Sequence, residues 1–312
     1  MSVTSDGRRV TPGSNGRRTR GARSATTSDE RLARLVIPKE RRESYVPREL
    51  PGGITDIDLL KRARDRRENV LLVGPTGSGK TAAVEALAAE LELPLVILQC
   101  NGALDPTVVF GLREIVDGET RFEESDAVRV IRAGGVLYFD EINFIRQEIA
   151  SIFFPLLDSR RVVAIPEMHG EKIVAHPDLF IVASMNPSYT GTHPLSDALK
   201  NRFAHHLRFE YDERIESRLL RSKTLRQLAK RLRSGSTMHL VSPVSTNKLI
   251  ELEQLAEEVG IEYAVSNFVN YFTEDEQGAV GEIVLLYKDA IATDLGLSSG
   301  ARSDVKRKKR GV

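Results

Sequence analysis

The amino-acid sequence predicts an α/β protein whose parallel sheet is followed by a smaller helical unit. Short runs of apolar residues alternate with longer segments of helical periodicity, a pattern typical of buried parallel strands joined by helices. The first run ends in a glycine-rich turn that opens a helix, and beyond Asp212 only helical patterns remain. These observations predict one α/β body and one helical unit within 312 residues.

Five apolar runs are the expected strands of the sheet. Each is short and bounded by charged or turn-forming residues, as in strands buried on both faces. They comprise residues 70–73, 95–98, 135–139 and 179–184, with a weaker fifth run at 205–209. The segment 162–174, with His169-Gly170 at its centre, predicts a β-hairpin.

The expected helices fall into two groups. After the first strand, small and apolar residues repeat at helical spacing at Ala82, Ala83, Ala86, Leu87 and Leu91. A second helix is predicted over 142–157. The helical unit is predicted from the leucine spacing over 219–232 and from further segments at 248–259, 264–272 and 279–292.

The composition is that of a globular protein with a charged surface, at 41% hydrophobic and 29% charged residues. No apolar stretch approaches the roughly 18 residues that a membrane span needs. The first ten residues lack the apolar segment of a signal peptide. Cys100 is the single cysteine, which excludes an internal disulfide and a multi-cysteine metal site. We therefore expect a cytoplasmic protein.

The charges are unevenly distributed, although the formal net charge is +1. Residues 1–50 carry 12 Lys and Arg against 6 Asp and Glu, and residues 301–312 carry 6 against 1, so the middle is acidic. Solvated ends without a specific role, and ends that touch nucleic acid or an acidic partner, both fit this pattern. The expected divisions are a disordered basic arm at 1–43, an α/β domain at 44–211, a helical domain at 212–295 and a basic tail at 296–312.

The strongest local signal is the turn between the first strand and its helix, which reads Gly74, Pro75, Thr76, Gly77, Ser78, Gly79, Lys80, Thr81. This is the P-loop pattern in the context that it requires. Its glycines let backbone N–H groups turn inward around phosphate oxygens, and the N-terminus of the following helix adds positive potential. Lys80 can reach the β- and γ-phosphates, and the Thr81 hydroxyl can ligate Mg²⁺. The motif predicts binding of a nucleotide.

Two acidic residues, Asp140 and Glu141, directly follow the apolar run 135–139. A carboxylate at this position lies beside the P-loop and can hold Mg²⁺, while the adjacent glutamate can polarise a water that attacks the γ-phosphate. The pair would also suit a helix N-terminus, which favours acidic residues. Together with the P-loop, Glu141 favours hydrolysis by water over phosphoryl transfer to another acceptor.

Two further polar residues extend this pattern. Asn186 follows the run 179–184, where its amide could bond to the attacking water and the γ-phosphate; an ordinary Asn-Pro turn is the alternative. Arg202 ends a short predicted helix, too far from its own P-loop but able to enter the site of a neighbouring chain as an arginine finger. Its alternative role is to stabilise the C-terminus of that helix.

The order of these motifs resembles that of AAA+ ATPases of the MoxR type. Residues 176–193 and 197–202 are similar to the CbbQ/NirQ/NorQ and gas-vesicle GvpN branch, and Tyr45-Val46-Pro47 and residues 261–272 also fit it. The resemblance covers residues 45–290 and implies an AAA+ core with strand order 5-1-4-3-2, a helical lid, and ATP and Mg²⁺ as cofactors.

The resemblance also implies roles for single residues. Lys80 and Thr81 would hold phosphate and Mg²⁺, Asp140 and Glu141 would form the second acidic motif, Asn186 would be the sensor, and Arg202 the finger. It further implies a homo-oligomeric ring, with six subunits expected, that remodels or activates a partner protein. Partners in this family often carry a von Willebrand A domain. The hairpin at 162–174 corresponds to an insertion that often faces the central pore of the ring.

One position departs from the family pattern. The family places an arginine in the lid shortly after a Ser-Thr pair, whereas Ser245-Thr246 is followed here by Asn247-Lys248. Lys248 could substitute as a point charge, but it cannot make the bidentate contact of an arginine. The departure puts the coupling of ATP to lid motion in question.

Two other functions fit the sequence. The basic ends, together with seven Lys and Arg between Arg218 and Arg233, suit a nucleic-acid-directed AAA+ motor, although a lid helix often exposes such residues to solvent. The missing lid arginine suits a nucleotide-gated binding module with slow turnover. The salt dependence of DNA binding separates the first alternative from a protein remodeller, and the rate of ATP turnover separates the second.

Overall fold

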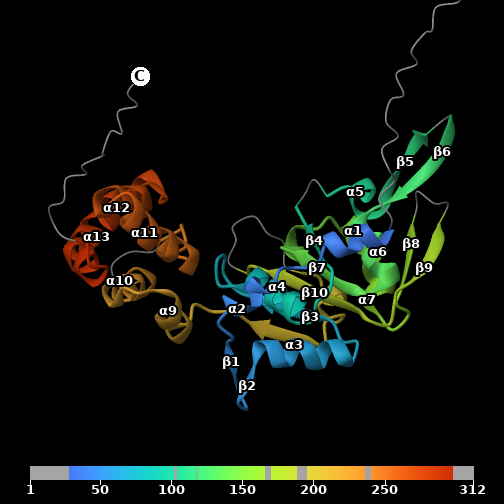
Figure 1. The fold of residues 1–312 in the computed structure, drawn as a ribbon, viewed down its shortest axis with the longest axis horizontal. Coiled ribbons are helices and arrows are strands. Elements are labelled where there is room, and N and C mark those ends of the chain that lie inside the picture. The colour runs from blue at the N-terminus through green and yellow to red at the C-terminus, as the bar shows by residue number, and fades with distance from the viewer. Residues whose placement is uncertain are drawn as a thin grey trace, which may run out of the picture.

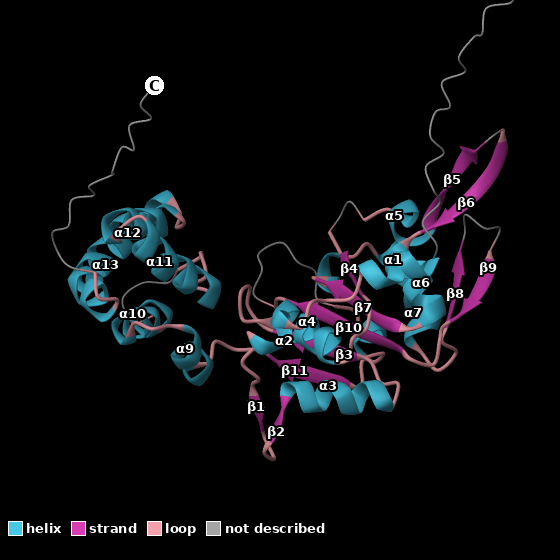
Figure 2. Ribbon diagram, in the orientation of Figure 1, coloured by secondary structure: helices cyan, strands magenta, loops and turns pink. Residues whose placement is uncertain are grey.

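The computed structural model describes residues 28–101, 104–116, 118–165, 170–187, 195–235 and 240–297. These residues form an α/β body and a lobe of helices, the latter coloured orange to red in Figure 1. Figure 2 shows that the strands of the central sheet lie side by side within the body, with helices around them. The two parts correspond to the α/β body and the helical unit that the sequence predicts.

Five parallel strands form the central sheet. In spatial order they are β11 (His205–Arg208), β3 (Val70–Val73), β10 (Leu179–Met185), β7 (Gly135–Asp140) and β4 (Leu95–Gln99). Every neighbouring pair is parallel. In chain order this is the sequence 5-1-4-3-2, which confirms the predicted fold class. Parallel strands bring their carboxyl ends to one edge, so the segments that follow β3, β10 and β7 become neighbours.

Helices cover both faces of the sheet. They are α3 (Asp56–Asp65), α4 (Lys80–Glu90), α5 (Pro106–Phe110), α6 (Asp126–Ala133) and α7 (Gln147–Leu157). Successive strand residues point to opposite faces. Along β7, Val136 and Tyr138 pack with α3 and α4, while Leu137 and Phe139 pack with α5, α6 and α7. Burial on both faces explains why these strands read as uninterrupted apolar runs.

The last part of the predicted disordered arm is folded, which corrects that expectation for residues 28–43. They form α1 (Ser28–Arg34) and α2 (Glu40–Glu43). Arg42 of α2 forms an ion pair with Glu90 of α4, so the segment is tied to the body. These helices are short and mostly charged, and therefore carry no apolar periodicity to mark them. Residues 1–27 and 298–312, which hold most of the basic ends, lie outside the described residues.

Three β-hairpins flank the central sheet. They are β1 (Glu49–Leu50) with β2 (Ile54–Thr55), β5 (Gly111–Val116) with β6 (Glu119–Glu124), and β8 (Val162–Ile165) with β9 (Glu171–Val174). Figure 1 shows the second and third projecting from the same side of the body. The third is the hairpin predicted at 162–174, although its centre at His169 lies outside the described residues. The first two were not predicted.

The helix predicted over 142–157 is interrupted. The chain instead forms a short 3-10 helix, η1 (Ile142–Phe144), passes through Ile145 and Arg146 in extended conformation, and then enters α7. The 3-10 turn holds Asn143 beside the sheet edge, where its side-chain amide donates to the carbonyl of Asn186 at 3.5 Å. A regular α-helix that began at residue 142 would replace this 3-10 turn after β7. The short α8 (Asp197–Lys200) precedes Arg202.

The helical lobe has a hydrophobic core of its own. It comprises α9 (Glu213–Leu219), α10 (Lys223–Arg233), α11 (Thr246–Glu258), α12 (Ile261–Asn270) and α13 (Glu274–Asp294). The leucine pattern at 219–232 is split between α9 and α10, because the Ser222 hydroxyl accepts the N–H of Leu225 at 3.0 Å and starts a new helix. The separate core supports our proposal that residues 212–295 are a distinct domain. No helix in the described part of the chain has both the length and the apolar character for a membrane crossing.

Candidate nucleotide-binding and hydrolysis site

The P-loop connects β3 to α4 in a space that excludes side chains at two of its glycines. A Cβ on Gly74 would lie 2.0 Å from the carbonyl oxygen of Phe209, which follows the neighbouring strand β11. Gly77 has a φ of +69°, and a Cβ there would lie 2.6 Å from the Cβ of Ser245 in the lobe. Only glycine combines this backbone angle with such close approach. The loop is therefore packed between the sheet edge and the start of α11.

Lys80, the first residue of α4, is held within the loop. Its ammonium donates hydrogen bonds to the carbonyls of Gly74 and Pro75, both at 2.8 Å. The side chain is largely buried, and this burial lowers the pKa of Lys80, while the nearby carboxylates of Asp140 and Glu141 act in the opposite direction. The loop thus holds a cation beside its backbone, as phosphate binding requires.

Asp140 lies at the centre of a hydrogen-bond network at the carboxyl edge of the sheet. Its Oδ1 accepts from the hydroxyls of Ser184 at 2.6 Å and Tyr138 at 3.0 Å, and its Oδ2 accepts from the Gln99 amide at 3.1 Å. The Tyr138 hydroxyl also lies 3.3 Å from Oγ1 of Thr81. Tyr138 therefore joins the two side chains that the sequence predicts as Mg²⁺ ligands.

These two oxygen donors fit Mg²⁺ that arrives with a nucleotide. Mg²⁺ is usually held by one or two protein oxygens together with substrate phosphates and water, not by an all-protein cage. The Thr81 hydroxyl and the Asp140 carboxylate share the Tyr138 hydroxyl as a neighbour, so both face one region. Among the described residues, no group of three or more His, Cys, Asp or Glu could hold a metal ion. The Thr81 hydroxyl and the Asp140 carboxylate therefore match the protein ligands expected for Mg²⁺ that binds together with a nucleotide.

Glu141 is held in a strained conformation at the end of β7. Its φ of 56° places a non-glycine residue in the left-handed region, which costs about 1–2 kcal/mol. The Ser184 hydroxyl accepts the Glu141 N–H at 3.0 Å and stabilises this conformation. Burial, and then the neighbouring Asp140, raise the pKa of Glu141, whereas Lys80 lowers it. Strain and a raised pKa are both common at active sites.

Asn186 connects β10 to the P-loop. Its side-chain amide donates to the Thr76 hydroxyl at 3.2 Å, and the residue is buried. This contact joins the end of β10 to the turn after β3, because the two strands are neighbours in the sheet. The predicted P-loop, Asp140-Glu141 and Asn186 thus all lie at one edge.

Arg202 lies away from this edge. The Asn69 amide donates to its carbonyl at 2.8 Å, and Asn69 immediately precedes β3, whereas the P-loop follows that strand. The four residues of β3 separate these ends by about 13 Å at the usual rise per residue. The Arg202 guanidinium lies over the ring of Phe154 at 4.1 Å and donates to the Phe154 carbonyl at 3.4 Å. Within one chain, Arg202 is not part of the P-loop site.

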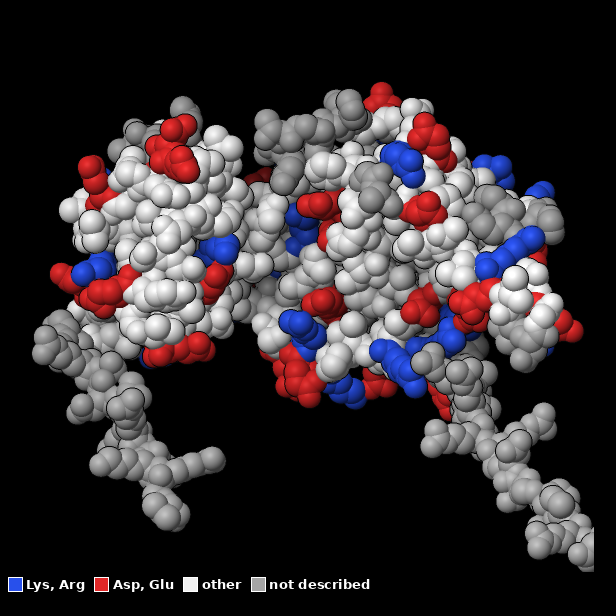
Figure 3. Space-filling view, turned by 90° about the horizontal axis from the view of Figure 1, so that it is seen from above, with Lys and Arg blue, Asp and Glu red and all other residues white. Residues whose placement is uncertain are grey.

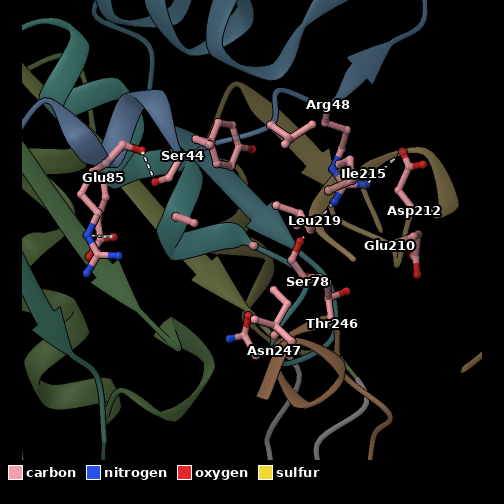
Figure 4. A pocket seen from close by; sticks show the side chains of 17 residues that line it. Ser44, Arg48, Ser78, Glu85, Glu210, Asp212, Ile215, Leu219, Thr246 and Asn247 are labelled. Carbon is pink, nitrogen blue, oxygen red and sulfur yellow. Dashed lines mark hydrogen bonds and ion pairs between the residues drawn. The ribbon is translucent and has the colours of Figure 1, made fainter. Parts of the chain in front are cut away.

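A cavity of about 170 Å³ opens beside the P-loop (Figure 4). Three parts of the chain line it: the segment before β1, the P-loop with the first turn of α4, and the lobe. Its apolar lining comprises Val46, Ala82, Ile215, Leu219 and Ile250. Its polar lining includes Arg48, Glu85, Glu210, Asp212 and Asn247. An apolar cleft with a few polar groups beside a phosphate-binding turn has the character of a site for a nucleotide base.

Lys248, the candidate replacement for the lid arginine, is engaged elsewhere. Its ammonium is 2.7 Å from a carboxylate oxygen of Glu251 and lies 4.8 Å from the centre of the Tyr271 ring. It does not line the cavity, whereas its neighbours Thr246 and Asn247 do. Sequence position alone suggested the substitution, and the tertiary contacts do not support it.

The sequence did not predict five residues at the site: Gln99, Tyr138 and Ser184 of the Asp140 network, Arg48 in the cavity wall, and Tyr211, whose hydroxyl donates to the P-loop carbonyl of Thr76. Two of them carried a usable signal. Tyr138 and Ser184 each lie two residues before a predicted site residue on a strand, and alternate strand residues share a face. The other three come from segments remote in sequence and carried no such signal.

Comparison with known proteins agrees with this geometry. Residues 69–203 match the family model of the AAA domain, dynein-related subfamily. An uncharacterised protein of Staphylococcus haemolyticus (strain JCSC1435) is 32% identical over 228 residues, which cover 67% of this chain and 86% of that protein. An uncharacterised protein of Staphylococcus aureus (strain USA300) is 36% identical over 144 residues, covering 45% of this chain and 54% of that protein.

Among solved structures, an ATPase candidate from Cytophaga hutchinsonii superposes with a TM-score of 0.44 and 16% identity, over 85% of this chain and 81% of that one. The sheet order and the P-loop define the class as a P-loop nucleotide-binding protein. Residues 69–203 carry an AAA domain of the dynein-related subfamily, and the chain belongs to the same family as the protein of Staphylococcus haemolyticus.

Proposed function

We propose that this protein binds ATP with Mg²⁺ and hydrolyses it to ADP and phosphate. One observation carries the proposal: the P-loop, Asp140-Glu141 and Asn186 come from three neighbouring strands and are joined at one edge by hydrogen bonds. Asn186 contacts Thr76, and Tyr138 lies between Thr81 and Asp140. A chance glycine-rich turn would not acquire these partners.

The residues divide the chemistry among them. The loop N–H groups and Lys80 bind the phosphates, and the cavity beside the loop receives the base. Thr81 and Asp140 are the side chains that would hold Mg²⁺, which neutralises charge on the phosphate oxygens. Glu141 accepts the proton of the attacking water, and the Asn186 amide orients that water toward the γ-phosphate. A raised pKa makes the Glu141 carboxylate a stronger base.

A binding experiment tests the phosphate site directly. Lys80→Ala should weaken MgATP binding strongly, because it removes the cation from the loop. Lys61→Ala is the matched control, since Lys61 forms an ion pair with Glu90 outside the site. Equal affinity of the Lys80 and Lys61 variants, measured by calorimetry on folded protein, would refute the assignment.

We further propose that the chain assembles into a ring in which Arg202 acts on the neighbouring subunit. This proposal is supported by the position of Arg202, which lies at the end of β3 opposite to the P-loop of the same chain. There its guanidinium lies over the Phe154 ring. A cation that enters from another subunit stabilises charge on the transferred phosphate, and raises kcat by about 10³–10⁵-fold where measured. Six subunits per ring follow from the resemblance to MoxR-type proteins and remain part of the proposal.

Mixing two inactive variants tests the shared site. Arg202→Ala and Lys80→Ala should each be nearly inactive alone. A mixed ring contains interfaces where an intact P-loop meets an intact Arg202, so hydrolysis should partly recover on mixing. No recovery, in assemblies shown by mass to contain both variants, would leave Arg202 with a structural role only.

The substrate that we propose is a partner protein, remodelled or activated by the ring as in the MoxR type and its CbbQ/NirQ/NorQ and GvpN branch. The same resemblance proposes a von Willebrand A domain in that partner. Of the seven basic residues from Arg218 to Arg233, three form ion pairs inside the lobe: Arg221 with Glu257, Lys230 with Glu213, and Arg233 with Glu216.

The charge distribution also favours a protein partner over nucleic acid. On the face seen in Figure 3, acidic and basic side chains of the described residues are interspersed over the body and the lobe, and no broad basic surface is visible on that face. A nucleic-acid motor would show binding that weakens steeply with salt. Measurement of DNA and RNA binding from low to physiological salt decides between the two, and tight, salt-sensitive binding would favour the motor.

A further inference from the structure

Two carbonyl groups of the P-loop are held from outside the loop. The Tyr211 hydroxyl donates to the carbonyl of Thr76 at 2.8 Å, and an Nη2 of Arg48 donates to the carbonyl of Ser78 at 3.1 Å. In a planar trans peptide, the carbonyl and the following N–H point in opposite directions. These two contacts therefore turn the N–H groups of Gly77 and Gly79 away from Tyr211 and Arg48.

The loop needs such restraint because of its composition. Glycine populates both signs of φ with little steric cost, so the peptides that precede Gly77 and Gly79 can rotate easily. A phosphate cradle requires those N–H groups to converge. Burial raises the pKa of Tyr211 to about 12, so its hydroxyl keeps the proton that the contact with Thr76 requires.

Both outside partners depend on the segment between β11 and α9. The Arg48 guanidinium lies over the Phe209 ring at 4.8 Å, and its Nη1 is 3.6 Å from a carboxylate oxygen of Asp212. Tyr211 lies between these two residues in the chain. Figure 4 shows Arg48 and Asp212 facing each other at the rim of the cavity. The segment that leads into the lobe thus positions both contacts to the loop.

The lobe in turn holds Tyr211. The Arg233 guanidinium of α10 lies over the Tyr211 ring at 4.0 Å. It is fixed by a bidentate ion pair with the buried carboxylate of Glu216, at 3.0 and 2.7 Å, and by donation to the Val244 carbonyl at 2.8 Å. Glu216 also accepts from the Thr246 hydroxyl at 2.7 Å, so α9, α10 and α11 converge on one network.

We propose that Tyr211 and Arg48 are positioning residues that aim the P-loop N–H groups at the nucleotide phosphates, and that Arg233 makes this alignment depend on the position of the lobe. The inference rests on the proposed nucleotide site. The contacts from Arg233 through Tyr211 to Thr76 connect the lid to the P-loop without Lys248. They therefore offer a way to couple nucleotide binding to lid motion in a chain that lacks the lid arginine. Neither residue needs to touch the reacting atoms.

The hydroxyl of Tyr211 can be removed without removing the ring. Tyr211→Phe should weaken ADP binding about fivefold, the size expected for one hydrogen bond. Pyrophosphate binding should weaken by a similar factor, because the change lies in the phosphate cradle and not in the base cavity. The KM for ATP should rise by the same factor while kcat stays within about twofold. Tyr271→Phe is the matched control, since that hydroxyl donates to the Pro243 carbonyl inside the lobe.

The link to the lobe is tested by a double-mutant cycle. Arg233→Gln should weaken ADP binding in the otherwise unchanged protein, but by much less in the Tyr211→Phe background, because its effect passes through the Tyr211 hydroxyl. Equal effects in both backgrounds would overturn the link. If Tyr211→Phe binds ADP and pyrophosphate as the unchanged protein does, the positioning role of Tyr211 is refuted. If the unchanged protein binds no ADP, the proposed nucleotide site fails instead.

Discussion

The P-loop has two sides that are built differently. On the sheet side, Asp140 and Glu141 are held by side chains of β7 and β10, and both Tyr138 and Ser184 are fully buried. On the lobe side, the loop is held by Tyr211 and Arg48. Tyr211 is held by Arg233 of the lobe, which has a hydrophobic core of its own, and Arg48 is held by Phe209 and Asp212 of the segment that leads into the lobe. Strand register fixes the first arrangement, whereas the position of the lobe controls the second.

Because the two sides of the P-loop are built differently, they should control different properties of the site. The sheet-side residues include the proposed base Glu141 and the proposed Mg²⁺ ligand Asp140, so changes there should alter turnover or metal dependence. The lobe-side residues act on the phosphate cradle before chemistry, so changes there should alter affinity. A sheet-side variant that loses mainly MgATP affinity, with its turnover retained, would contradict this assignment.

Replacement of the proposed base should have the largest effect. Glu141→Gln should lower kcat by about 10²–10⁴, because an amide cannot accept the proton of water as a carboxylate does. MgATP affinity should be retained. Steady-state turnover and equilibrium binding measure the two quantities, and Glu148→Gln on the exposed first turn of α7 is the control. Turnover at the unmodified rate would remove Glu141 from the mechanism.

Loss of the Ser184 hydroxyl should have the next largest effect. Ser184→Ala leaves the N–H of Glu141 without its partner and removes one of the two hydroxyls that donate to Oδ1 of Asp140, and should lower kcat by about 10-fold or more. The KM for ATP should change little. Ser151→Ala is the control, because the Ser151 hydroxyl bonds only within the exposed surface of α7. A raised KM with normal kcat would instead place Ser184 on the binding side.

Tyr138→Phe should change the Mg²⁺ dependence of hydrolysis. The hydroxyl lies between Thr81 and Asp140, so its loss should raise the Mg²⁺ concentration for half-maximal activity by about three- to fivefold. Titration of activity with MgCl₂ at saturating nucleotide measures the shift. An unchanged Mg²⁺ requirement would show that Tyr138 does not orient the two ligands.

The pH dependence should give the smallest effect. The Glu141 carboxyl must be deprotonated to accept a proton, and burial together with Asp140 raises its pKa above the ordinary value of 4.5. Activity should therefore be lost, as pH falls, at a pH above that value. The profile of kcat/KM against pH reports this ionisation in the free enzyme. A profile that stays flat down to the ordinary glutamate pKa would contradict the raised pKa.

Much of the body could be predicted because its signals are local. The five strands are apolar runs, and their predicted positions agree with the structure at both central and edge positions. The helices at 28–43 and the hairpin β5–β6 were missed because they are short, charged and without apolar periodicity. The helix predicted over 142–157 was wrong in its first turn, where the chain forms η1 and passes through Ile145 and Arg146 in extended conformation before α7 begins.

The fold class, the P-loop and the acidic and amide residues at the strand ends could be predicted from the sequence, because each depends on residues adjacent in the chain. Parallel pairing then brings those strand ends together without further information. The side chains that hold the P-loop from the lobe side could be identified only from the three-dimensional structure. Arg48, Tyr211 and Arg233 are separated by up to 185 positions, and neither spacing nor composition relates residues that far apart. The structure also excludes Lys248 as the replacement for the lid arginine, because its ion pair with Glu251 and its contact with Tyr271 hold it away from the cavity.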